Sequence, residues 1–402
     1  MRSTLSIVID IKTRVFDDED IAYRLFPGQG YRHFKAMKDH SVVFLDNPGI
    51  PLPGRNGYDK DEVTLQAIAR SEEKQSLISA NSDNLDAQLR AVDEKDFSNA
   101  RWGSKRDLNR GWINALYHRA RIGDLVVVPS PGIIKDDDGE WVRVKTLVGE
   151  IVGKPERWDR NGPENLIKGK YIVRRVKWLA QINESELDPK VAIALRTQNA
   201  LTALRARSFE RVLGAAYKNI VLGEEFLARF ITNDEAFTAF ESYHFNAFVM
   251  AVVAACRRVD SGEEPYADGL SIYDIAAEVE GQDELVPDQE SSIHSPGYMT
   301  LRGAVLVPAV LSALFALAVA ASADPALDPF AGDGPDAVEV VNSESEAFDP
   351  CEVGIDETVR DALNIMGHAR WQQMCAAAVR ANSNDGLQSI ATVESRPDDD
   401  GQ

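Results

Sequence analysis

Short runs of β-branched and other apolar residues, separated by glycine, proline or charged residues, dominate the region from Ile122 to Leu179. The runs lie at 122–129, 147–154 and 176–179, and runs of this length and composition are typical of strands. An Asp-Gly pair in the acidic segment 135–140 separates the first two runs and favours a hairpin turn there. The pattern predicts three or more antiparallel strands in a small curled sheet or barrel, closed at one end by a helix near 112–121.

The segments before this region change repeatedly between strand and helix patterns. We predict strands at 6–12 and 41–45, a short helix at 17–25, a loop at 47–58 and a polar helical segment at 60–98. The apolar stripe of the last segment is loose. It is therefore either an insertion that covers a pocket or an excursion over the surface.

The second half of the chain, from Ser208 onward, has the apolar spacing of helices. The predicted helices cover 209–230, 234–258, 272–279 and 356–381, and the predicted irregular segments are an acidic loop at 282–296, an exposed linker at 324–350 and a frayed tail at 382–402. These elements predict an all-α second half. With the strands of the first half, the expected fold class is α+β.

One segment of the second half, residues 303–323, is 21 residues long and carries no charge. Its length matches the hydrocarbon core of a membrane. Eight of its residues are alanine, and Pro308 shortens the uninterrupted part. We therefore expect a buried core helix, and the alternative is a membrane span that would associate the protein with the inner membrane.

The charge of the chain is distributed unevenly. Residues 1–205 hold 33 Lys and Arg against 30 Asp and Glu, whereas residues 206–402 hold 11 against 34. A change of this size near Arg205 predicts two domains, 1–205 and 206–402. The strongly negative second domain repels phosphate, so we expect any nucleic acid to be bound by the first domain.

Cysteine and the N-terminal sequence indicate a reducing compartment. The three cysteines are far apart and form no ligand pair, which argues against a zinc site or a disulfide framework. Residues 1–10 have neither a long apolar core nor a cleavage site, so they predict a first strand and not a signal peptide. We expect a cytoplasmic protein with no cofactor and no metal.

The motifs of nucleases and nucleotide hydrolases are not found in a usable form. A restriction nuclease needs two carboxylates for Mg²⁺ and a lysine beside them on adjoining strands. Glu72-Glu73-Lys74 has the required residue types but lies in a helical stretch. Lys218 is the one lysine of the second half. No phosphate-binding Gly-x-x-x-x-Gly-Lys-Ser/Thr motif occurs. Whether the protein is an enzyme is left open, and the lack of a usable motif argues against it.

Tryptophan and arginine residues suggest a surface that binds a nucleobase. Five of the six tryptophans lie in the first half, close in sequence to basic residues. An extruded base needs a flat side chain to stack on, a polar edge to read it and cations for its phosphates. The candidates for the base are Trp158, Trp178, Trp112 and Asn47, and those for phosphate are Arg157, Arg160, Arg174, Arg175 and Lys177.

The tryptophan candidates can serve either in a base-binding pocket or in the hydrophobic core. Trp158 lies in a loop and is the strongest pocket candidate, whereas for Trp112 and Trp178 the core explanation is favoured. Alternation along a strand at 171–179 places Arg174, Val176 and Trp178 on one face and the intervening basic residues on the other.

The strand series also resembles a known family. The sequences ARIGDLVV (120–127), VGEIVG (148–153) and RVKWL (175–179) look like the PUA/EVE-like module at the N-terminus of Mrr- and McrB-type modification-dependent restriction proteins. YRHF (31–34), VVFLDNPG (42–49) and the segment 182–205, where LDP (187–189) opens a helix, are similar to other parts of that module. The resemblance covers residues 1–205 and implies a PUA/EVE-like small β-barrel whose pocket reads a modified base.

These features lead to one hypothesis and two alternatives. The hypothesis is an anti-phage defence protein in which residues 1–205 sense modified or foreign DNA. Residues 206–402 would act by self-assembly, by binding a protein partner or at a membrane. The alternatives are a diverged modification-dependent endonuclease and an RNA-binding PUA-like module.

Overall fold

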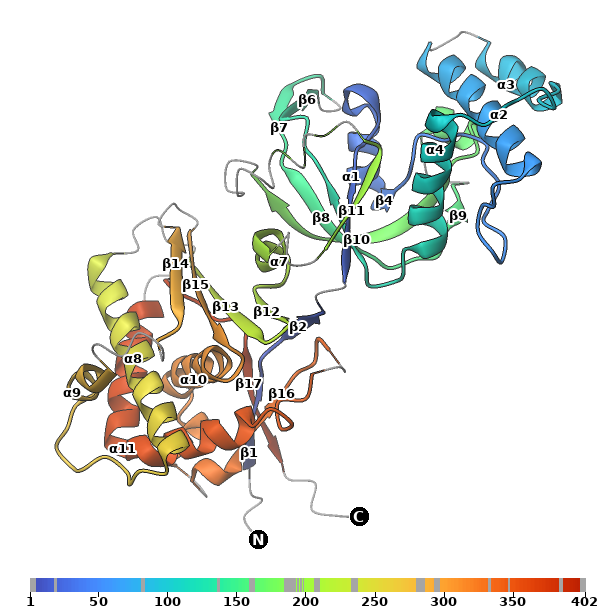
Figure 1. Cartoon of the computed structure of the whole chain (residues 1–402). Coiled ribbons are helices and arrows are strands. Elements are labelled where there is room, and N and C mark those ends of the chain that lie inside the picture. Colours follow the sequence, from blue (N-terminus) through green and yellow to red (C-terminus); the bar gives the residue numbers. More distant parts are fainter. Residues whose placement is uncertain are drawn as a thin grey trace. The chain divides into compact units, whose positions relative to one another are not determined.

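The computed structural model describes most of the 402 residues, which form two compact units (Figure 1). The described residues are 5–17, 20–80, 84–135, 138–158, 163–183, 193, 195, 197, 199–205, 210–232, 238–279, 286–292, 297–331, 334–345, 348–382 and 386–397. Unit A contains residues 18–216, and unit B contains residues 1–17 together with 217–402. Residues 1–17 therefore belong to unit B. The predicted division at Arg205 placed them in the first domain.

Unit A is built on one curled sheet (Figure 1). Its strands follow the order β11 (Leu201–Arg205), β3 (Ile21–Leu25), β5 (Leu125–Val128), β8 (Thr146–Ile151), β10 (Ile172–Ile182) and β4 (Val42–Val43), with β9 (Glu156–Arg157) also paired to β10. Only the β3–β5 contact among these pairs is parallel. The predicted curled sheet is confirmed, because its β-branched runs are the buried strands β5, β8 and β10.

The Asp-Gly turn forms the predicted hairpin, with strands β6 (Ile133–Lys135) and β7 (Trp141–Arg143). Gly139 has a φ of +82°, a conformation that glycine adopts without steric cost. A second glycine, Gly149 in β8, is needed for packing. A Cβ atom there would lie 2.6 Å from the Trp178 ring, so this position admits no side chain while the indole lies across the strand.

The helices of unit A are α1 (Phe34–His40), α2 (Glu62–Ser79), α3 (Leu85–Glu94), α4 (Ser104–Asn114) and α5 (Glu164–Lys168), and α4 continues into a π-helical turn at Ala115–Arg119. Asp61 caps α2 by accepting a hydrogen bond from the Thr64 amide at 2.7 Å. Ile68 and Ile78 of α2 are buried in the core. The polar segment 60–98 is therefore part of the packed unit and not a surface excursion.

The predicted short helix at 17–25 is wrong. Residues 21–25 form strand β3, which pairs with β11 on one side and β5 on the other. Acidic residues before Ile21 favour a helix start locally, but the two strand neighbours decide the conformation. Both neighbours are more than 90 residues away in sequence, so a local pattern could not show them.

Unit B contains two sheets, so the prediction of an all-α second half is also wrong. In the first sheet β1 (Leu5–Asp10) lies between β16 (Val338–Val341) and β17 (Thr392–Pro397). In the second, the order is β14 (Asp288–Ser292), β15 (Gly297–Ala304), β13 (Glu225–Thr232), β12 (Asn219–Leu222) and β2 (Thr13–Phe16). The expected linker and tail thus contain strands, and the expected helix at 209–230 is α7 (Glu210–Tyr217) followed by β12 and β13.

The main helices of unit B are α8 (Ala239–Ser261), α9 (Ile272–Ala276), α10 (Leu306–Ala323) and α11 (Ile355–Asn382). Helix α10 is the uncharged segment, and its residues from Pro308 to Ala318 are buried. The Phe315 ring contacts Phe230, Phe245 and Phe248, with centroid distances of 5.3 to 5.6 Å. Both α8 and α10 are long and apolar enough to cross a membrane, but 67% and 61% of their most apolar windows are buried, which favours the core-helix prediction for α10.

Candidate functional site

Trp158, the strongest candidate from the sequence, is buried in unit A with 4% of its surface exposed. Its ring contacts His40 and Phe44, with centroids 5.3 and 5.5 Å away. Its backbone amide donates a hydrogen bond to the carbonyl of Tyr171 at 2.9 Å. This packing closes the indole to a nucleobase, so the expectation that it serves as a stacking residue is corrected.

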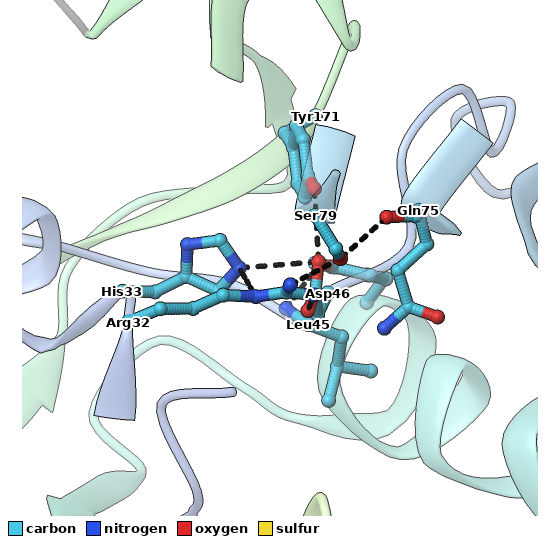
Figure 2. Close-up of polar contacts among 8 residues, drawn as sticks. Arg32, His33, Leu45, Asp46, Gln75, Ser79 and Tyr171 are labelled. Atoms are coloured by element: carbon cyan, nitrogen blue, oxygen red, sulfur yellow. Dashed lines mark hydrogen bonds and ion pairs between the residues drawn. The ribbon is translucent and has the colours of Figure 1, made fainter. Parts of the chain in front are cut away.

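Beside this aromatic cluster, Asp46 joins four segments of unit A (Figure 2). The Tyr171 hydroxyl donates to Asp46 Oδ1 at 2.9 Å, and His33 Nε2 lies 3.1 Å from the same oxygen. The Arg32 guanidinium contacts both Asp46 Oδ2 and the Ser79 hydroxyl of α2. These contacts connect the start of α1, the turn after β4, helix α2 and the start of β10.

The Asp46 carboxylate is stabilised in its charged form. Burial by itself raises the pKa of this carboxyl, but the hydrogen bonds from His33 and Arg32 outweigh burial and hold the pKa well below its usual range. Asn47 follows in the same turn and is half-buried. Its backbone amide donates a hydrogen bond to the carbonyl of Leu45 at 2.7 Å. The turn that carries Asn47 is therefore fixed by the network at Asp46.

The Glu72-Glu73-Lys74 motif is used for ion pairs on α2. Lys74 is buried and bonds Asp93 at 2.5 Å. Glu72 pairs with Arg106 at 2.9 Å, and Glu73 pairs with Lys95 at 2.8 Å. A nuclease motif needs these side chains to converge on one metal. Here they contact three separate partners, as expected of a structural helix.

Arg174 is buried in unit A, with 2% of its surface exposed, and is not available to phosphate. Its guanidinium donates to the carbonyls of Gly153 at 3.0 Å, Leu116 at 3.1 Å and Ala120 at 2.5 Å. Leu116 lies in the π-helical turn after α4, and Ala120 directly follows that turn. The prediction of a phosphate contact is corrected: this cation satisfies backbone acceptors at a helix C-terminus.

The other predicted phosphate ligands on β10 and β9 are exposed. Arg175 and Lys177 lie on the face of β10 opposite Arg174, as strand alternation predicted. Arg175 bonds Glu156 at 2.6 Å, and Arg157 donates to the carbonyl of Lys170 at 3.2 Å. Arg160 lies outside the described residues.

Trp178 packs across the sheet. The ring lies against Gly149, and its Nε1 donates to the carbonyl of Lys38 at 3.3 Å. These contacts support the core alternative for Trp178, since both the ring face and the polar edge are in use.

Trp112 is the predicted aromatic that lines an open pocket. The pocket measures about 570 Å³ and is bordered by α4, the π-helical turn and β11; its lining residues are Ser104, Asp107, Leu108, Arg110, Gly111, Trp112, Ala115, Arg119, Leu201 and Ala203. Arg110 pairs with Asp107 at 3.1 Å and donates to the carbonyl of Tyr58. Arg119 is exposed beside them. The pocket therefore combines an indole, two guanidinium groups and an apolar wall.

A second open pocket, of about 590 Å³, was missed by the sequence analysis. It lies by the β6–β7 hairpin and is lined by Tyr31, Ser130, Pro131, Gly132, Ile133, Arg143, Val144, Lys145, Thr146 and Asn183. The sequence held one signal for it. Trp141 and two basic residues follow the Asp-Gly turn at alternate positions, which places them on one face of the predicted hairpin.

Within the part of the chain that the structure describes, no group of three or more His, Cys, Asp and Glu side chains is arranged to hold a metal ion. The comparisons with known proteins add no relative: no family model matches the chain, and no curated protein matches its sequence. The PUA/EVE-like resemblance therefore remains a prediction.

Proposed function

We propose that unit A binds nucleic acid and holds a nucleobase against Trp112, as the sensing part of an anti-phage defence protein that detects modified or foreign DNA. The observation that carries this proposal is the pocket whose lining includes Trp112, Arg110 and Arg119. An indole gives a base a stacking surface, which is worth about 1–3 kcal/mol per base. Guanidinium groups that line the same pocket can contact the phosphates next to that base.

The volume of the pocket suits one base and part of its sugar. At about 570 Å³ it lies within the range of small-molecule sites. Leu108, Leu201 and Ala203 give the pocket apolar lining, and its one described acidic lining residue is Asp107, whose carboxylate is paired with Lys60 and Arg110. A carboxylate can also accept a hydrogen bond from an exocyclic amino group of a base.

The distribution of charge supports unit A as the nucleic-acid-binding part. Unit A holds 32 Lys and Arg against 29 Asp and Glu, and unit B holds 12 against 35. Phosphate contacts supply most of the affinity of nucleic-acid-binding proteins. Unit B opposes such contacts by its net charge and fits the proposed role in self-assembly or partner binding.

The proposal is tested by electrophoretic binding assays at low salt with plain, hydroxymethylated and glucosylated duplexes. We expect wild-type protein to bind at least one modified duplex more tightly than the plain one. Trp112→Ala should weaken that binding roughly 10-fold, and Trp112→Phe should retain most of it because a flat ring remains. Equal, undetectable binding of all three duplexes would remove the proposal. Competition with tRNA distinguishes DNA from RNA as the bound nucleic acid.

A further inference from the structure

The β6–β7 hairpin of unit A exposes one face that combines apolar and basic side chains. Cross-strand register pairs Ile133 with Arg143 and Lys135 with Trp141, so these four side chains share a face. The alternate residues Ile134 and Val142 face the other way and pack against the core of the unit. One face of the hairpin is therefore packed against the core, and the other face is exposed to solvent.

The open face is unusual in what it leaves exposed. Trp141 is 69% exposed and Ile133 is 54% exposed. The Lys135 ammonium lies over the Trp141 ring, 5.2 Å from its centroid, a distance at which a cation is attracted to an indole. An exposed indole with cations around it can stack on a base and contact the phosphate attached to that base.

The face continues into the second pocket. Ile133 and Arg143 belong to both, and Lys145 extends the row of basic residues at the next alternate position. The hydroxyl groups of the lining residues Ser130 and Thr146 bond the local backbone, since Ser130 donates to the carbonyl of Val144 at 2.7 Å and Thr146 accepts from the amide of Ser130 at 3.1 Å. No Asp or Glu is among the described lining residues of this pocket. The charge of the pocket is thus positive, which suits an anionic ligand.

The described carboxylates of this hairpin are at its turn. Asp138 and Glu140 are exposed between β6 and β7, at the end of the hairpin away from Lys145. A phosphate placed between Arg143 and Lys145 therefore meets two cations, at the end of the hairpin away from these carboxylates.

We propose that this face and its pocket form a second nucleic-acid contact, which binds one unpaired nucleotide. Its base stacks on Trp141, and its phosphate lies between Arg143 and Lys145. This inference rests on the proposed function, in that the same unit binds nucleic acid, but it uses residues separate from the pocket at Trp112.

Fluorescence anisotropy of the full chain tests this contact. The probes are a labelled thymidine single strand of about 12 nucleotides, within the site sizes of small single-strand-binding folds, a fully paired duplex, and unlabelled thymidine monophosphate as competitor. Trp141→Ala should weaken single-strand binding roughly 10-fold and change duplex binding little. Arg143→Ala with Lys145→Ala should make single-strand binding less dependent on salt, with a slope smaller by about 0.7 to 1.4.

The controls separate this inference from the proposed function. Lys95→Ala removes an exposed lysine that directly follows α3 and pairs with Glu73. This variant should leave single-strand binding unchanged. Thermal denaturation should show that Trp141→Ala folds normally, since the ring is exposed. Competition by the monophosphate would support a contact for one nucleotide, whereas competition by longer strands alone would contradict a site for a single nucleotide.

Two results would overturn the inference. If Trp112→Ala weakens binding and Trp141→Ala does not, the hairpin contact is wrong while the proposed function stands. If wild-type protein binds a modified duplex but not the single strand, the hairpin contact is likewise wrong and the proposed function stands. Weakened single-strand binding by Trp141→Ala together with full binding by Trp112→Ala would keep the hairpin contact and reject the pocket at Trp112.

Discussion

Asp46 and Arg174 show what single charged residues do in unit A. The sequence marks Arg174 as one of several basic residues and gives Asp46 no role, yet Arg174 is buried, Asp46 is half-buried, and both join segments distant in sequence. Their partners include backbone carbonyls and side chains more than 50 residues away, which no local pattern contains. Strand alternation did place Arg175 and Lys177 on the exposed face of β10 correctly, because that rule depends only on neighbouring residues.

Replacement of Asp46 tests the network that it organises. Asp46→Asn removes the charge and leaves Arg32 and His33 facing a neutral group, so we expect the free energy of unfolding to fall by roughly 3 kcal/mol. The matched control is Asp39→Asn, whose exposed pair with Lys35 contributes less than about 0.5 kcal/mol. Urea denaturation of both variants measures the two costs. Similar small losses would show that the network is not important for stability.

The pH dependence of stability follows from the lowered pKa of Asp46. A carboxyl whose pKa is lower in the folded state stabilises the fold above its unfolded pKa, about 4, and loses that contribution as the pH falls further. The difference in unfolding free energy between wild type and Asp46→Asn should therefore be constant above about pH 5 and shrink below about pH 4. Urea denaturation across this pH range measures it, and a difference that persists to the lowest pH would contradict the assignment.

At the scale of elements, the region 122–179 could be predicted because its strands carry their own signals. β-branched runs, bounding glycines and the Asp-Gly pair indicate β5, β8, β10 and the hairpin without reference to the rest of the chain. Of the elements that were mistaken, β3, β16 and β17 are strands whose partners lie far away in sequence, whereas β13 pairs with its neighbour β12 and with the distant β15. For these the pairing decides the conformation, and the local pattern is ambiguous.

Two glycine substitutions test the packing of unit A in opposite directions. Gly149→Ala in β8 would place a Cβ against the Trp178 ring and the Lys177 carbonyl, so we expect a loss of about 1–3 kcal/mol in unfolding free energy. Gly111→Ala in α4 meets no atom within 4 Å outside its own helix and should stabilise the helix by up to about 1 kcal/mol. Thermal unfolding compares them, and a neutral Gly149→Ala would show that the ring can move aside.

The whole molecule is divided so that the two ends of the chain share unit B. β1 near the N-terminus pairs with β17 near the C-terminus and with β16, and neither contact could be inferred from the sequence of a single segment. The charge division was visible in the sequence because it needs only counting. The candidate site was visible in part: Trp112 was named, whereas the hairpin face was not.

Substitution of Ile9 tests this division. Ile9 is fully buried in β1, so Ile9→Ala should cost about 2–4 kcal/mol within unit B. Hydrogen exchange should show the loss of protection in β16 and β17 and leave β5, β8 and β10 of unit A unchanged. Ser6→Ala, on the same strand but with an exposed hydroxyl, is the control. Equal loss of protection in both units would mean that they unfold as one.

The most direct test of the central claim, that unit A holds a nucleobase against Trp112, is the affinity of wild type, Trp112→Ala and Trp112→Phe for modified and plain duplexes at one low salt concentration. The account expects wild type and Trp112→Phe to bind a modified duplex with similar affinity and Trp112→Ala to bind it roughly 10-fold more weakly. Identical affinities for all three proteins, or no binding to any duplex, would contradict it.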